Sequence, residues 1–242
     1  MDELDDTFDQ WAPDLPGFGE SPPGRRHTIG SYVRVLVEYI ERFSGPVHVL
    51  ANSMGGLIAV RLAGFRGDLV SSLTLVSPAM PAYRLPSAAR GMAVLAMPRI
   101  GERLLARINN VSPEEQVRRL ANVMFGDPTL IDDEGFQLVV DERTRRMQQE
   151  HGDAVLLESL RSIVRHYVVP PSRSAWAEAK QVRCPTLVVF GERDTLVGAA
   201  TAAKWRRAVP HATVVTLPTT GHVAMMEQPS TVASLIRDTV VR

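Results

Sequence analysis

The chain has 242 residues, which is enough for one sizeable domain or for a domain with an insertion. Its 27 basic and 27 acidic residues balance to a formal net charge of zero, so nothing points to nucleic acid or an anionic membrane as a partner. A single cysteine, Cys184, excludes an internal disulfide, and no cluster of ligand-type side chains has metal-site spacing, so we expect no metal and no cofactor.

The N-terminal segment, MDELDDTFD, is acidic and has no apolar stretch of the kind that a secretory signal needs. No apolar run elsewhere approaches the roughly 20 residues of a membrane span. We therefore expect a cytoplasmic protein without a membrane span.

The first half of the chain predicts a strand, a helix and a second strand. Phe8–Ala12 is expected to form a short strand, and a loop rich in Pro and Gly follows it. Apolar residues recur at helical spacing after Thr28, which predicts a helix that ends near Phe43. Thr28 can cap the start of this helix. Pro46–Ala51 is apolar and predicts a buried strand, and the residues after Gly56 predict a helix.

Ser53 lies at the junction of that second strand and the helix after it. Ala51 precedes it by two residues and Gly55 follows it by two, so the chain can turn sharply enough to expose the serine Oγ above the sheet. The backbone N–H of Met54 could then stabilise an oxyanion. A plain turn with the same small residues also occurs by chance, so Ser53 is a candidate and needs partners.

Two candidate partners follow later strands. Cys184–Phe190 is an apolar run that leads to Asp194, and Ala212–Leu217 is another, followed by a loop with His222. The carboxyl ends of parallel strands meet at one edge of a sheet, where such folds place their chemistry. A serine, an imidazole and a carboxylate together make a nucleophile, its base and the group that orients the base.

Alternatives to these two partners are weaker. Glu192 lies closer to its strand than Asp194 does and is expected to be a loop charge. The strand at Leu73–Val76 ends without a carboxylate. His48, inside the strand before Ser53, is expected to be a packed or capped core residue. The other histidines are expected on the surface or on helices: His27, His151, His166 and His211.

Strand signals stop near Pro78 and resume near Val182, and the residues between them read as helices. The expected helices are Ser87–Met97, Gly101–Ile108, Pro113–Met124, Asp133–Gln149 and Ala154–Tyr167. We therefore expect a core made of residues 1–78 and 182–242, with residues 79–181 inserted as a helical unit. Met80, Tyr83, Trp176 and Val223 are candidates for contact with a substrate, although most apolar residues of the insertion are expected to form its own core.

Four segments together resemble the α/β-hydrolase family: Ala12–Ser21, Ala51–Gly56, Phe190–Asp194 and Thr219–Pro229. The resemblance implies an α/β fold, a mostly parallel sheet flanked by helices, with residues 79–181 as a helical cap. It implies that Ser53 is the nucleophile, His222 the base and Asp194 the orienting acid, with Met54 giving one oxyanion N–H. A hydrolase of carboxylic esters or related acyl bonds, acting on a small apolar substrate, is the resulting prediction.

The segment ANSMGG also resembles meta-cleavage product hydrolases, which cleave C–C bonds, but those typically have Trp where this chain has Val223. The family further implies strands and a His-Gly loop before Phe8, and this sequence has neither. We expect the polypeptide to begin upstream of Met1. A truncated and catalytically impaired hydrolase, or a binding protein on a decayed hydrolase fold, is the alternative. The oligomeric state stays open.

Overall fold

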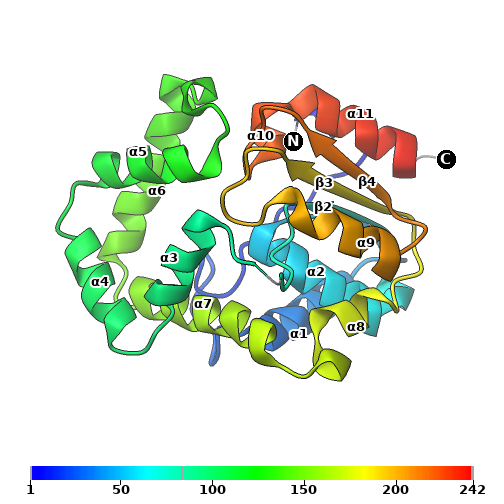
Figure 1. Ribbon diagram of the computed structural model, residues 1–242, viewed down its shortest axis with the longest axis horizontal. Helices are drawn as coiled ribbons and strands as arrows, with labels where there is room; N and C mark the ends of the chain where they lie inside the picture. The colour runs from blue at the N-terminus through cyan, green and yellow to red at the C-terminus, as the bar shows by residue number, and fades with distance from the viewer. Residues whose placement is uncertain (1, 83, 241–242) are drawn as a thin grey trace.

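The computed structural model describes residues 2–82 and 84–240 and is built around a parallel sheet (Figure 1). The sheet has four strands in the order β1-β2-β3-β4, and every neighbouring pair is parallel. Their bounds are β1 (Val47–Asn52), β2 (Val70–Val76), β3 (Thr186–Gly191) and β4 (Thr213–Leu217). The carboxyl ends of all four strands therefore lie along one edge, as the sequence predicts.

Helices cover both faces of this sheet, because side chains along each buried strand alternate between two apolar cores. Val188 and Phe190 belong to the larger core, and Val189 belongs to the smaller one. The larger core is covered by α1 (Ile29–Ile40), α2 (Ser53–Phe65), α8 (Ala175–Ala179) and α9 (Ala202–Ala208). The smaller core is covered by α10 (Ala224–Glu227) and α11 (Pro229–Val240). Short 3-10 turns lie at Asp2–Leu4, Gly67–Leu69, Pro128–Leu130, Pro171–Arg173 and Ala199–Thr201.

The strand predicted at Phe8–Ala12 is wrong. Residues 8–12 have no regular secondary structure and join no strand ladder, and the rings of Phe8 and Trp11 pack against His48 and Phe43. The Phe8 ring lies edge-on against the His48 ring, with centroids 5.1 Å apart. His48 is itself exposed on β1, with its Nδ1 2.8 Å from the Ser72 Oγ, and is not the core residue that the sequence suggested.

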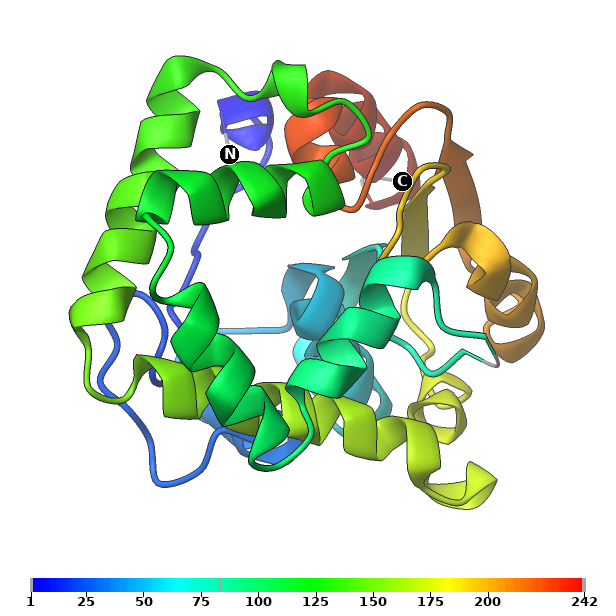
Figure 2. The ribbon, with the colours of Figure 1, turned by 60° about the vertical axis from the view of Figure 1, so that its left-hand side comes forward.

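The chain between β2 and β3 forms a helical insertion, a name used here for residues 79–181. Its helices are α3 (Ser87–Leu95), α4 (Ile100–Ile108), α5 (Pro113–Met124), α6 (Asp133–Gln148), α7 (Gly152–Val168) and α8. The first five confirm the predicted helices, whereas α8 was not predicted. Figure 2 shows α4, α5 and α6 standing away from the sheet, with the chain returning beside α10. No helix in the described ranges is both long and apolar enough to cross a membrane.

Local capping explains where several of these helices begin. Thr28, Ser112 and Asp132 each accept a hydrogen bond from the backbone N–H three residues later. Such a cap contributes about 1 kcal/mol to helix stability. The prediction that Thr28 starts a helix is thus confirmed, and the helices of the insertion have the same kind of local determinant.

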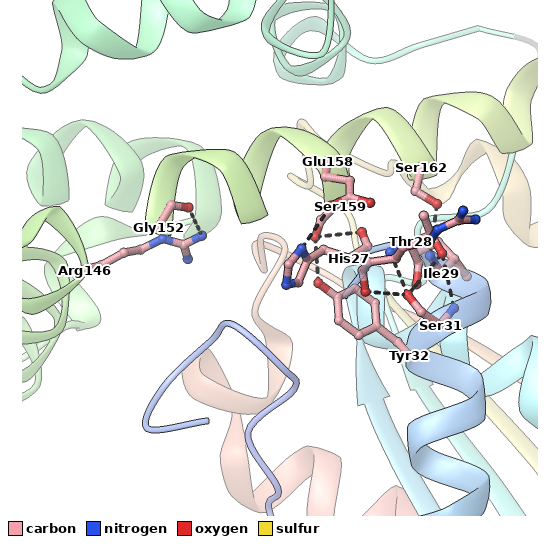
Figure 3. Close-up of polar contacts among 11 residues, drawn as sticks. His27, Thr28, Ile29, Ser31, Tyr32, Arg146, Gly152, Glu158, Ser159 and Ser162 are labelled. Atoms are coloured by element: carbon pink, nitrogen blue, oxygen red, sulfur yellow. Dashed lines mark hydrogen bonds and ion pairs between the residues drawn. The ribbon is translucent and has the colours of Figure 1, made fainter. Parts of the chain in front are cut away.

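A polar network joins α7 to the start of α1 (Figure 3). The His27 Nδ1 lies 2.9 Å from the Glu158 Oε2, and the Tyr32 hydroxyl lies 2.9 Å from the Ser159 Oγ. The Ser159 hydroxyl also donates to the backbone carbonyl of His27. His27 is only 8% exposed, so its expected surface position is wrong. It is buried because α7, a segment far along the chain, packs over it.

Candidate active site

Ser53 is the first residue of α2 and directly follows the carboxyl end of β1. Its φ is +52°, in the left-handed region that costs a non-glycine residue energy. The turn is tight, since a Cβ added at Gly56 would lie 2.7 Å from the Pro78 Cβ. The sharp strand-to-helix turn predicted from the small residues is confirmed, and the serine itself has the strained backbone conformation.

The side chain of Asn52, at the N-cap of α2, does not cap the helix. Its Nδ2 donates instead to the Val76 carbonyl at 3.0 Å and to the His222 carbonyl at 3.1 Å. The first N–H groups of α2, including that of Met54, are therefore left for another acceptor. A helix N-terminus with uncapped N–H groups favours an anionic oxygen.

His222 and Asp194 form a buried pair. The His222 Nδ1 lies 2.9 Å from the Asp194 Oδ2, and both side chains are 0% exposed. The Asp194 Oδ1 accepts the backbone N–H groups of Leu196 at 2.8 Å and Val197 at 2.9 Å. The Nε2 of His222 is buried and has no hydrogen-bond partner among the residues that the structure describes. The imidazole is thus oriented through its Nδ1, whereas its Nε2 is left without a partner among these residues.

The contacts of Asp194 favour its ionised form. Burial raises the pKa of this carboxyl. The hydrogen bond and charge interaction with His222, together with the N–H of Val197, lower the pKa by more than burial raises it. The net pKa of Asp194 lies below its ordinary value. The rival carboxylate, Glu192, is exposed and accepts only a 3.4 Å hydrogen bond from the Thr219 backbone N–H. His222 is therefore paired with Asp194 and not with Glu192.

The candidate substrate contacts have other surroundings. Met80 is buried in the larger core, and Trp176 packs there against the Trp205 ring, 5.2 Å between centroids. The Trp176 Nε1 donates to the Pro81 carbonyl at 2.7 Å, which fixes the chain just after β2. Val223 is buried next to His222. Tyr83 lies outside the described residues. As substrate contacts all four stay predictions.

Sequence reasoning missed two neighbours of the base. The backbone N–H of His222 donates to the Met124 carbonyl at 2.6 Å, and Met124 ends α5 of the helical insertion. No sequence signal marks this contact, because it depends on the path of the insertion in space. Glu227 is a second such neighbour, since its Oε1 accepts the Gly221 N–H at 2.7 Å. It lies within Thr219–Pro229, one of the four segments that resemble the α/β-hydrolase family.

Comparison with known proteins agrees with this fold. A family model described as "Alpha/beta hydrolase family" matches residues 1–235. The chain belongs to the α/β hydrolase family. Among solved structures, this hydrolase matches 2-hydroxy-6-oxo-6-phenylhexa-2,4-dienoate hydrolase from Rhodococcus sp. strain RHA1 with a TM-score of 0.75 and 23% identity, covering 98% of this chain and 82% of that one. A thermophilic esterase from Thermogutta terrifontis gives a TM-score of 0.70 at 24% identity, covering 98% and 81%.

Curated relatives of this α/β hydrolase include a dienoic acid hydrolase and a lipase. It is 27% identical over 230 residues to 2-hydroxy-6-oxo-6-(2'-aminophenyl)hexa-2,4-dienoic acid hydrolase of Metapseudomonas resinovorans, covering 92% of this chain and 70% of that protein. It is 29% identical over 220 residues to Lipase 1 of Psychrobacter immobilis, covering 89% and 63%. The relatives are hydrolases in both cases, and they do not single out one substrate.

Proposed function

We propose that this α/β hydrolase cleaves a carboxylic ester or a related acyl bond through Ser53, His222 and Asp194. The observation that carries the proposal is the buried His222–Asp194 pair with its unpartnered Nε2, and the strained turn at Ser53 supports it. Asn52 links the two, since it precedes Ser53 and its side chain binds the His222 carbonyl. An imidazole held by a carboxylate is what a serine hydroxyl needs to become a nucleophile.

In this mechanism Ser53 attacks the substrate carbonyl while His222 accepts the hydroxyl proton at Nε2. The ionised Asp194 holds the Nδ1–H and stabilises the imidazolium that forms. The oxyanion of the tetrahedral intermediate is stabilised by the backbone N–H of Met54 at the start of α2. His222 then donates its proton to the leaving alcohol. A water molecule, activated by the same imidazole, hydrolyses the acyl-enzyme and regenerates the serine.

The helical insertion acts as a cap in this proposal. The last residue of its helix α5, Met124, reaches the backbone of His222, which supports a position over the reaction site. A cap supplies apolar walls, excludes water and selects the substrate. Small apolar esters are therefore the substrates to test first.

Covalent labelling tests the proposal directly. A fluorophosphonate probe should modify the folded wild-type protein at Ser53, as mapped by peptide mass spectrometry, and should not modify Ser53→Ala. The wild-type protein should also hydrolyse p-nitrophenyl esters, and Ser53→Ala should not. Folded protein that is neither labelled nor active would overturn the assignment, and would favour a binding role for the fold.

Cleavage of a C–C bond is the second candidate, and the relative from Metapseudomonas resinovorans favours it. Val223 argues against it, because the enzymes of that group typically have Trp after the base. The two candidates predict opposite preferences between a p-nitrophenyl ester and a 2-hydroxy-6-oxo-dienoate. A higher kcat/KM for the dienoate would reverse our choice of bond while leaving the roles of the three residues in place.

A further inference from the structure

The helical insertion makes direct backbone contact with the loop that carries His222. We call residues 124–127 the docking segment and residues 219–222 the base loop. The His222 N–H donates to the Met124 carbonyl at 2.6 Å, so the backbone of the proposed base is hydrogen-bonded to the insertion. Figure 2 shows the C-terminal end of α5 reaching the region of α10, as these bonds require.

Glu227, the last residue of α10, joins the two segments a second time. Its Oε1 accepts the Gly221 N–H of the base loop at 2.7 Å. Its Oε2 accepts the Gly126 N–H of the docking segment at 2.8 Å and lies 3.4 Å from the Asp127 N–H. A charged acceptor makes stronger hydrogen bonds than a neutral one. One carboxylate therefore fixes the spacing between the insertion and the residue before the proposed base.

Glycines allow the two backbones to meet with no side chain between them. A Cβ at Gly126 would lie 2.2 Å from the Thr219 carbonyl oxygen, and a Cβ at Gly221 would lie 2.4 Å from the Gly126 nitrogen. Neither position can hold a larger residue unless the backbone moves. Close approach of the two backbones thus requires glycine on each side of the contact.

The docking segment and the residue before it, Val123, also contact the loop that carries Asp194. Arg193 donates from Nη1 to the Gly126 carbonyl at 3.2 Å, and Thr195 donates from Oγ1 to the Val123 carbonyl at 3.3 Å. The flanks of both members of the His222–Asp194 pair therefore contact one short stretch of the insertion. A movement of that stretch would be transmitted to both.

We propose that Glu227 is a positioning residue that couples the docking of the helical insertion to the orientation of His222. This inference rests on the proposed function and deepens it. With the docking segment in place, the backbone of Gly221 and His222 is held, which fixes the position of the imidazole. When the segment moves away, the His222 N–H loses its acceptor, the Met124 carbonyl, and Glu227 loses its bond from the Gly126 N–H. The Gly221 N–H is then held only by a carboxylate that is itself no longer fixed, and the alignment of the base is lost. The insertion therefore gates the chemical step as well as covering the substrate.

Glu227→Gln is the test variant because it keeps the size of the side chain. The amide has one acceptor oxygen, and its NH₂ group would face a backbone N–H, so one of the two bonds is lost. Glu192→Gln is the matched control. It makes the same change of charge beside the base loop, but its carboxylate is exposed and accepts only the 3.4 Å bond from Thr219.

We expect Glu227→Gln to lower kcat for a p-nitrophenyl ester by about 10- to 100-fold, the size of effect that a small misplacement of a catalytic group produces. KM should change by less than about threefold, because the substrate site itself is untouched. Glu192→Gln should match the wild-type protein. A purely structural role would instead lower the melting temperature and leave the kcat of the folded protein unchanged, and that result would overturn the proposal.

Gly126→Ala tests the same contact from the insertion side. Its Cβ would push against Thr219, so kcat should fall as it does for Glu227→Gln. The double variant should lose clearly less than the product of the two single losses, because both changes break one contact. Independent, multiplying effects would show that Glu227 does not act through the docking segment.

Hydrogen exchange separates a failure of this inference from a failure of the proposed function. In Glu227→Gln, peptides that cover residues 121–127 and 219–228 should both exchange faster than in wild-type protein and in Glu192→Gln. Unchanged exchange in both peptides would overturn the coupling even if the protein is an active esterase. Faster exchange of both peptides in a protein that no fluorophosphonate labels would support the coupling and reject the ester chemistry.

Discussion

The side-chain amide of Asn52 donates to the backbone carbonyl of His222 at 3.1 Å, which joins the residue before Ser53 to the proposed base. The same amide donates to the Val76 carbonyl at 3.0 Å. Asn52 thus connects the ends of β1 and β2 with the loop after β4. The turn that exposes Ser53 and the loop that carries His222 are held in register by one side chain.

Asn52→Ala should therefore weaken catalysis in a protein that still folds. Loss of both donors leaves two carbonyl oxygens without this partner, at a cost of about 1–3 kcal/mol in the free energy of unfolding. We expect kcat/KM for an ester to fall by about 10-fold or more, because His222 is no longer held relative to Ser53. Ester kinetics and denaturant unfolding measure the two effects.

Asn52→Asp is the control of equal shape. It cannot donate to either carbonyl, and its carboxylate can accept the N–H groups of α2 that the proposed oxyanion needs. Its kcat/KM should be at least as low as that of Asn52→Ala. Normal activity in Asn52→Asp would contradict both roles that we give to this residue.

Much of this arrangement could be predicted from local sequence, and the reason is physical. The turn at Ser53 is determined by neighbouring small residues, and helices such as α5 and α6 are determined by periodicity and by their own N-caps. Ser53, Asp194 and His222 each come after the end of a predicted strand, which predicts a shared sheet edge because parallel strands align their carboxyl ends. Each of these features depends on a few neighbouring residues.

The failures of prediction depend on contacts between distant segments. Phe8–Ala12 has the composition of a strand, but a strand also needs a partner for its backbone groups, and ring packing on His48 does not supply one. His27 is buried by α7, which lies far along the chain. The contact between Met124 and His222 likewise depends on the path of the insertion. Single-sequence patterns contain none of this information.

Asp194→Asn should abolish most of the activity while preserving the fold. The amide oxygen can still accept the N–H groups of Leu196 and Val197, but the NH₂ group would face the Nδ1 of His222. The imidazole would then carry its proton on Nε2 and could not act as a base. We expect kcat to fall by about 10⁴-fold, as for the equivalent change in other triads. Retained ester hydrolysis would reject Asp194 as the orienting acid.

Asp194 also predicts how stability depends on acid. Its folded pKa is lower than its unfolded pKa, so the stability that it contributes is present above the ordinary carboxyl range and is lost as pH falls through the folded value. The difference in unfolding free energy between wild-type protein and Asp194→Asn should therefore shrink below about pH 4. Urea unfolding at several pH values measures it, and a constant difference across that range would contradict the pKa direction.

Gly56→Ala and Gly55→Ala form a matched pair for the turn at Ser53. A Cβ at Gly56 would lie 2.7 Å from the Pro78 Cβ, so α2 or the segment after β2 must shift. At Gly55 the nearest atom, the Ala51 Cβ, would be 3.7 Å away, which is an ordinary contact. Gly56→Ala should lower the free energy of unfolding by about 1–3 kcal/mol, whereas Gly55→Ala should change it little. Equal effects of the two substitutions would mean that close packing on Pro78 does not restrict the turn.

His166 predicts a second and separate dependence on pH. Burial and the nearby positive charges of Arg61 and Arg165 lower the pKa of His166 to about 4, and its Nε2 lies 3.2 Å from the Arg61 Nη1. The unfolded chain therefore binds a proton at this residue between its ordinary pKa, about 6.5, and about pH 4, and the folded protein does not. The free energy of unfolding should fall as pH drops through this interval. Below the interval His166 should cause no further loss.

His166→Gln tests this interval, because glutamine cannot be protonated there and still offers an acceptor to Arg61. The variant should show a flatter loss of unfolding free energy between about pH 6.5 and pH 4 than the wild-type protein shows. His211→Gln is the control, since this exposed histidine lies between α9 and β4, with its Nε2 3.1 Å from the Cys184 carbonyl. If wild-type and His166→Gln proteins lose stability in parallel, then His166 is protonated in the folded state as readily as in the unfolded chain. Its pKa would then not be lowered by folding.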